Sequence, residues 1–257
     1  LGYGQPKNHP LENATTLKEI EDYHWPDPDW IDVSQIKGDA EEYSDEYAIL
    51  GGEWSPFWPD AVDLFGMENL MINMYDKPEL VKAVFKHIVD YYAAATKKIF
   101  EAAADEIDIY FIGNDFGSQT GPLLSEKLFK KFIYPHLKRL AELGHKYDLY
   151  VMMHCCGGFN PLIPDIIKAG IDALQALQPS ARGMDPVELK QKFGDKIVLN
   201  GSIDTQEVLI EGNPELVRKK TRQVLEIMKP GGGYILSPSH DYLLEETPVE
   251  NVVAMYD

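Results

Sequence analysis

The sequence has few cysteines and no long apolar run. Its two cysteines, Cys155 and Cys156, are adjacent. Such a pair does not form a structural disulfide framework, so a reducing, cytoplasmic location is expected. No stretch reaches the roughly 18 consecutive apolar residues of a membrane span. The first residues also do not combine a basic segment with an apolar one, so we expect neither a membrane anchor nor a secretory signal.

Positive charge is also scarce. The sequence has 42 acidic residues against 24 basic ones, which gives a net charge of −18, and a field of that sign repels polyanions. Nucleic acid is therefore not an expected partner. Arginine is especially rare, so a substrate that carries many carboxylates would find few cationic partners.

Short apolar stretches alternate with helix-type periodicity over most of the sequence. Prolines at positions 78, 186 and 214 suit the first turn of a helix. Strand-like composition recurs six times, in residues 47–50, 107–112, 150–154, 172–175, 196–200 and 234–236. This alternation predicts a parallel sheet of the α/β class, and the length suits a single (β/α)8 TIM barrel.

Only about six of the eight strands of such a barrel can be counted. We therefore expect a barrel that lacks its N-terminal part or is truncated there, and the sequence begins with Leu rather than Met. Residues 1–45 are expected to form an irregular lead-in segment with one or two short helices. Residues 46–257 are expected to form the barrel domain.

The third apolar stretch ends in metal-binding side chains. Side chains two positions apart on a strand point to the same side, so His154 and Cys156 would share a face while Cys155 points away. A catalytic zinc site needs three protein ligands and an open position. His240 is the expected third ligand because it also follows a strand. The alternative is that the cysteines are small buried residues and His154 is a hydrogen-bonded strand-end histidine.

Polar residues follow the other predicted strands as well, at the ends that build the active site of a barrel. Asp115 lies on a glycine-rich loop and is the leading catalytic carboxylate, although it could equally be a turn residue that accepts hydrogen bonds from its own loop. His240 is a second catalytic candidate. The expected substrate-binding residues are Asn114, Gln119, Gln178, Asn200 and Asp204.

From about residue 45 to its end, the sequence resembles the uroporphyrinogen decarboxylase superfamily. That superfamily includes the decarboxylase and the zinc-dependent methylcobamide:thiol methyltransferases. The motifs that carry the resemblance are Asn114–Ser125, Phe132–His136, His154-x-Cys156-Gly157, Gly201–Asp204, Gly231–His240 and Thr247–Asn251. The methyltransferase branch is closer, because its zinc is held by a His-x-Cys pair and a later cysteine. His240 stands at the position of that later cysteine, as a histidine does in the decarboxylase.

The resemblance implies a zinc-assisted transfer of a methyl group between a corrinoid and a thiol or similar acceptor. The cofactors would be zinc and a corrinoid carried by a partner protein, and Asp115 would orient the substrate or manage a proton. One alternative is a lyase that decarboxylates uroporphyrinogen or a related porphyrin precursor without a cofactor, with Asp115 and His240 at the substrate. Another is a barrel that binds a corrinoid or tetrapyrrole without catalysis. The sequence leaves open whether the chain forms a homodimer.

Overall fold

A six-stranded parallel sheet organises the fold. The computed structural model describes residues 6–257. Neighbouring strands follow one another in the order β1-β2-β5-β6-β7-β8, and every neighbouring pair is parallel. The strands are β1 Leu50–Gly51, β2 Ile109–Gly113, β5 Tyr150–His154, β6 Ala173–Leu177, β7 Val198–Ile203 and β8 Tyr234–Pro238. Each strand of this sheet thus lies beside the next one along the chain, which is the strand order of a (β/α) barrel.

The predicted α/β class and parallel sheet are therefore confirmed, and the six strands are the six expected from the sequence. Among residues 6–257, β1 and β8 are the outer strands and are not paired with each other. A small antiparallel hairpin of β3 (Gly117–Ser118) and β4 (Gly121–Pro122) follows β2.

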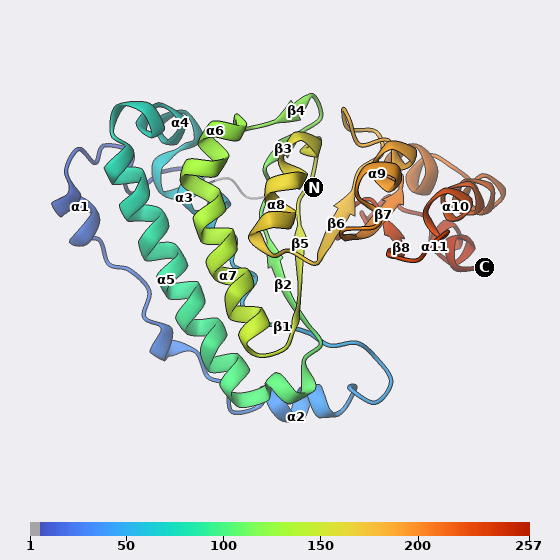
Figure 1. The fold of residues 1–257 in the computed structure, drawn as a ribbon, viewed down its shortest axis with the longest axis horizontal. Helices are drawn as coiled ribbons and strands as arrows, with labels where there is room; N and C mark the ends of the chain where they lie inside the picture. The colour runs from blue at the N-terminus through green and yellow to red at the C-terminus, as the bar shows by residue number, and fades with distance from the viewer. Residues whose placement is uncertain (1–5) are drawn as a thin grey trace.

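Helices connect the strands and supply the apolar layer against the sheet. The longest, α5, begins at Pro78, and its apolar residues at spacings of three and four are buried. It packs beside α7 (Figure 1). The helices are α1 Leu17–Glu21, α2 Ile36–Glu41, α3 Phe57–Phe65, α4 Met67–Asp76, α5 Pro78–Ala103, α6 Glu126–Leu128, α7 Tyr134–Lys146, α8 Ile163–Ala169, α9 Pro186–Phe193, α10 Pro214–Met228 and α11 Val249–Tyr256. None of them is both long and apolar enough to cross a membrane.

The helical segment between Ser125 and Lys146 is divided. A π-helical turn, Phe129–Ile133, separates α6 from α7. Pro135 explains the division, because proline has no backbone N–H and its ring collides with the carbonyl four residues earlier in a regular α-helix. The wider turn accommodates Pro135 at the start of α7.

The lead-in segment contains α1, α2 and a short 3-10 turn, as its weak periodicity predicts. Thr16 and Glu19 form a capping box at α1 that the sequence reading missed. Both helices pack on α5, and Leu11 and Ile20 belong to the same buried core as the sheet. The domain boundary after residue 45 remains a prediction.

The register of the sheet brings several strand ends together. Gly113 of β2 pairs with His154 of β5, which pairs with Gln175 of β6. The loops that follow these three strands therefore begin side by side at one edge of the sheet. Metal-binding and polar residues of the sequence lie in these loops.

Candidate metal centre and active-site cavity

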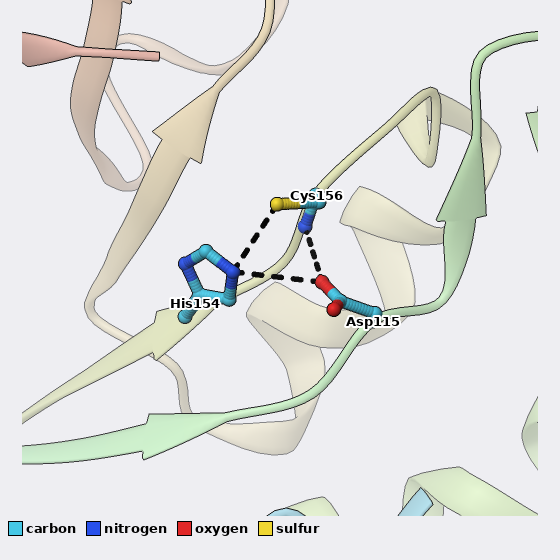
Figure 2. A group of neighbouring side chains, drawn as sticks. All are labelled: Asp115, His154 and Cys156. Atoms are coloured by element: carbon cyan, nitrogen blue, oxygen red, sulfur yellow. Dashed lines mark hydrogen bonds and ion pairs between the residues drawn. The ribbon is translucent and has the colours of Figure 1, made fainter. Parts of the chain in front are cut away.

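Three donor atoms of different chemistry meet just beyond the ends of β2 and β5 (Figure 2). His154 Nε2 lies 3.3 Å from Cys156 Sγ and 3.5 Å from Asp115 Oδ1. The same Asp115 oxygen accepts a 2.7 Å hydrogen bond from the backbone N–H of Cys156. One nitrogen, one sulfur and one oxygen donor, all within 4.8 Å of one another, thus form a candidate metal site.

Close backbone packing places these side chains. The loop after β2 crosses the loop after β5, and a Cβ atom added at Gly117 would lie 2.5 Å from the carbonyl oxygen of Cys156. Gly157 has a φ of +78°, and a Cβ added there would lie 2.6 Å from Gly117. Since any larger residue would separate the two loops, the glycines allow Asp115 to reach the backbone of Cys156.

The two cysteines have different environments, as their positions on a strand predict. Cys155 is fully buried in the apolar core, and its sulfur accepts a 3.3 Å hydrogen bond from the backbone N–H of Phe116. Burial raises the pKa of the Cys155 thiol. Cys156 is partly exposed and faces the donor cluster. Only Cys156 is therefore placed to bind a metal or react.

Two residues that the sequence reading missed hold the other side of the His154 ring. His154 Nδ1 lies 2.6 Å from Gln175 Oε1 and 3.2 Å from Asp241 Oδ2. Gln175 Nε2 also donates a short hydrogen bond to Asp241 Oδ1. The signals available in the sequence were the place of Gln175 on the next strand and of Asp241 beside His240. These contacts direct Nε2 towards Cys156 and Asp115.

Contacts within the cluster shift the pKa values of His154 and Asp115. Burial acts to lower the pKa of His154, but hydrogen bonds with Asp115, Asp241 and Cys156 outweigh burial and raise it. Burial acts to raise the pKa of Asp115, yet His154 and the Cys156 backbone hold it below its usual value. An imidazolium between two carboxylates is thus favoured, and a metal ion at Nε2 would replace its proton.

The donor set fits zinc. Zinc accepts imidazole, thiolate and carboxylate ligands, and two donors on one tetrahedral zinc ion lie roughly 3.5 Å apart. The separations of 3.3 Å and 3.5 Å from His154 Nε2 to its two neighbours match that value. Three protein donors leave a fourth position for a substrate, as in catalytic zinc sites. The hydrogen bonds on Nδ1 are also the outer contacts that zinc-binding histidines use.

A cavity of 660 Å³ opens over the cluster. Three of its lining residues are the donors Asp115, His154 and Cys156. Among the other residues that line it are Trp54, Asp63, Asn114, Gln119, Gln178, His240, Asp241 and Tyr242. Most of the residues predicted from the sequence are therefore gathered around one cavity.

His240 lies on the wall of this cavity but is not one of the three clustered donors. Its Nδ1 accepts a 3.1 Å hydrogen bond from the backbone N–H of Tyr242. The third donor beside His154 and Cys156 is Asp115 rather than the expected His240. Roles for His240 as a metal ligand and as a catalytic residue remain predictions.

The predicted substrate-binding residues differ in their surroundings. Asn114 is buried, and its side chain accepts a hydrogen bond from Trp58 N and donates one to the Ser55 carbonyl, which is a structural role. Asn200 accepts a hydrogen bond from Ser237, and Asp204 caps the π-helical turn Thr205–Ile210. Neither lines the cavity over the cluster.

Gln119 and Gln178 do line that cavity, and their side-chain amides contact each other at 3.4 Å. Gln178 also accepts a hydrogen bond from Gly157 N. These two are the predicted substrate-binding residues with a polar group at the cavity. Substrate contact stays a prediction for all five residues.

Comparisons of the sequence with known proteins identify one family, and a comparison of the structure finds a matching fold. The family described as Uroporphyrinogen decarboxylase (URO-D) matches residues 5–257. The methylcobamide:CoM methyltransferase MtbA of Methanosarcina mazei is 22% identical over 245 residues, covering 90% of this chain and 66% of that protein. A uroporphyrinogen decarboxylase of Rickettsia rickettsii is 30% identical over 138 residues, covering 53% of this chain and 37% of that protein.

A solved methyltransferase structure from Methanosarcina mazei matches the whole chain with a TM-score of 0.71 and 21% sequence identity, over 69% of its own length. At that identity the likeness concerns the fold. The chain spans between 59% and 66% of the length of the methyltransferase relatives that it matches.

Proposed function

The chain belongs to the uroporphyrinogen decarboxylase family, and from this premise we propose that it acts in zinc-assisted methyl transfer between a corrinoid and a thiol. The observation that carries the proposal is the meeting of Asp115, His154 and Cys156 at the carboxyl ends of parallel strands. Those ends are where barrel enzymes hold their catalytic groups. Relatives named methylcobamide:CoM methyltransferase and methylated-thiol–coenzyme M methyltransferase support this choice within the family.

Asp115, His154 and Cys156 are the residues that would hold zinc. The ion would supply positive charge that keeps a thiol substrate as its thiolate, since a free thiol with a pKa near 8.5 is mostly protonated at neutral pH. Cys156 must be reduced to serve as a ligand, which agrees with a reducing compartment such as the cytoplasm.

The protein residues around the ion would position and desolvate the reacting groups. Gln175 and Asp241 hold the imidazole of His154 from its Nδ1 side, so that Nε2 keeps its direction towards the substrate position. The half-exposed carboxylate of Asp115 would pass the proton that the thiol loses on to solvent. Gln119 and Gln178, which line the cavity, would hydrogen-bond the polar end of the thiol.

The methyl donor would be a corrinoid presented at the mouth of the cavity by a separate protein. The cavity of 660 Å³ lies over the donor cluster and would receive the thiol and the transferred methyl group. The partner protein would hold the corrinoid against the strand ends.

Decarboxylation of uroporphyrinogen is less favoured by the charges on the cavity wall. Among the described residues, the lining includes the carboxylates Asp63, Asp115 and Asp241 but no lysine or arginine. A substrate with many carboxylates needs cationic groups there. The wall better suits a substrate with few negative charges.

Metal analysis tests the zinc site. Chain purified under reducing conditions without added zinc should contain about one zinc per chain, as a three-donor site predicts. Cys156→Ala should lose the metal, and the adjacent Cys155→Ala should retain it because Cys155 faces the core. A wild-type chain without stoichiometric zinc would contradict the proposal.

Activity assays separate the three functions. Demethylation of methylcobalamin by coenzyme M or another thiol, followed by its absorbance change, is the expected reaction, and Cys156→Ala should abolish it. Release of carbon dioxide from uroporphyrinogen would instead identify a decarboxylase. Tight corrinoid binding with neither reaction would identify a binding protein.

A further inference from the structure

A second cavity lies on the outer side of α3, between the lead-in segment and α5. Its volume is 230 Å³. Four aromatic side chains line it: Tyr23 and Trp25 from the lead-in segment, and Tyr91 and Tyr92 from α5. Asp60 and Asp63 of α3 also line it. Asp63 lines the active-site cavity as well, so the two cavities adjoin across α3.

The aromatic rings face different directions instead of forming one flat wall. Tyr23 and Trp25 meet edge to face, with ring centroids 5.0 Å apart at 72°. Tyr91 and Tyr92 do the same, at 5.3 Å and 63°. Rings from two separate segments thus line one small space. The His87 ring stacks on one face of Trp25, with ring centroids 4.7 Å apart, so the other rings and the second face of Trp25 are available to a ligand. Arrangements of this kind bind cations, because the face of an aromatic ring carries partial negative charge.

The two carboxylates at this cavity have no positive partner within the described chain. Asp60 accepts a 2.6 Å hydrogen bond from the Tyr92 hydroxyl and experiences the like charge of Asp63. The nearby cations are engaged elsewhere: Lys86 pairs with Asp90, His87 with Glu21 and Lys98 with Asp29. The charge of Glu53 also acts on Tyr91 and Tyr92. A half-buried negative region therefore remains uncompensated.

A bare metal ion does not suit this region. Among residues 6–257, the one group of three metal-binding side chains is Asp115, His154 and Cys156, at the other cavity. Calcium needs six to eight oxygen ligands and magnesium near-ideal octahedral geometry, whereas two carboxylates and four rings line this space. The expected occupant is a cation that carries its own apolar surface.

We propose that this cavity binds a small organic cation of the alkylammonium class. Tyr23, Trp25, Tyr91 and Tyr92 would contact its alkyl groups, and Asp60 and Asp63 would compensate its charge. This site is separate from the proposed methyl transfer, so either proposal can fail without the other. Because Asp63 lines both cavities, a bound cation would also lie beside the active-site cavity.

Calorimetry with choline and with its neutral carbon isostere, 3,3-dimethyl-1-butanol, tests the proposal. The two molecules have nearly the same shape, so charge is the main difference. We expect one choline per chain and binding of the isostere about 5- to 30-fold weaker, since the cation contributes about 1–2 kcal/mol in such a site. Equal binding of both molecules, or no binding of choline at about 10 mM, would overturn the proposal.

Variants locate the bound cation. Asp63→Asn changes an exposed carboxylate and should preserve the fold, and it should weaken choline binding about fivefold. Asp60→Asn and Trp25→Phe should weaken it as well. Asp76→Asn, an exposed acidic residue on α4 outside the cavity, is the matched control and should leave binding unchanged. Equal affinity in wild type, Asp60→Asn and Asp63→Asn would overturn the assignment of the cavity.

Discussion

Asp241 Oδ2 lies 3.2 Å from His154 Nδ1, on the side of the imidazole opposite to Cys156. A carboxylate behind a metal-binding histidine fixes the ring orientation and increases its basicity. The sequence indicates His240 as a site residue but not its neighbour Asp241. In the structure, Asp241 is the residue of this pair that contacts the donor cluster.

Asp241→Asn should weaken zinc binding by about 10- to 100-fold, the usual effect of removing an outer partner of a metal-binding histidine. Competition with a chromophoric chelator measures the affinity directly and does not depend on turnover. Glu246→Gln changes an exposed carboxylate in the same loop and serves as the control. Equal zinc affinity in Asp241→Asn and wild type would show that Asp241 does not support the ligand.

Asn114→Ala should destabilise the fold, because it leaves the buried backbone N–H of Trp58 without its partner. It also removes one of the two hydrogen bonds to the Ser55 carbonyl, which keeps the bond from Phe57 N. The expected loss in free energy of unfolding is about 1–3 kcal/mol, measured by urea denaturation. Gln119→Ala changes an exposed residue of the same cavity and should cost less than about 0.5 kcal/mol. Equal effects of the two substitutions would contradict a structural role for Asn114.

His136 should make the protein less stable in acid. Burial against Phe57 and Phe85 is the main cause that lowers the pKa of His136 to about 4, with Arg139 adding to it and Asp90 opposing it. The unfolded chain takes up a proton near the ordinary pKa of 6.5. The neutral form therefore stabilises the fold above pH 6.5, and this contribution is lost as the pH falls towards 4.

The difference between the His136 pKa of about 4 in the folded chain and 6.5 in the unfolded chain corresponds to at most about 3 kcal/mol of unfolding free energy. His136→Gln should remove this part of the pH dependence. Urea denaturation from pH 7 to pH 4 measures it in both proteins. Parallel stability curves for wild type and variant would refute the interpretation.

Asp60 should make the protein less stable as the pH rises, which is opposite to the effect of His136. Burial is the main cause that raises its pKa from 3.8 to about 6, and the Tyr92 hydroxyl opposes the shift. Between these pH values the unfolded chain ionises while the folded chain stays protonated, so stability falls as the pH rises. The loss should reach at most about 3 kcal/mol above pH 6.

Asp60→Asn should therefore be more stable than wild type at pH 8, with the difference vanishing near pH 3. Thermal unfolding at both pH values is the measurement, and Asp76→Asn, an exposed carboxylate on α4, is the control. A destabilised Asp60→Asn at pH 8 would indicate that ionised Asp60 is satisfied in the fold.

Most of the fold could be predicted from the sequence because strands and helices depend on local patterns. The β-type stretch 150–154 and the helix that begins at Pro78 match the structure closely. The π-helical turn before Pro135 could not be inferred, because a break at proline does not specify the geometry that accommodates it.

Contacts between site residues could be predicted only within one strand end. His154 and Cys156 are two residues apart, so strand geometry alone places them together. Asp115 and Asp241 reach the same imidazole from loops that follow other strands, and their positions depend on how those loops cross. Both residues follow predicted strands, but the sequence alone does not show which of the side chains at the strand ends contacts His154.

The opposite environments of the two adjacent cysteines provide a chemical measure of folding. In the folded chain stripped of metal, an alkylating reagent should modify Cys156 first, since its thiol is partly exposed. Cys155 should react only when the core opens. Mass spectrometry of the singly and doubly alkylated chain would then follow unfolding with no added probe, and the rate of the second addition would report the free energy of opening around β5.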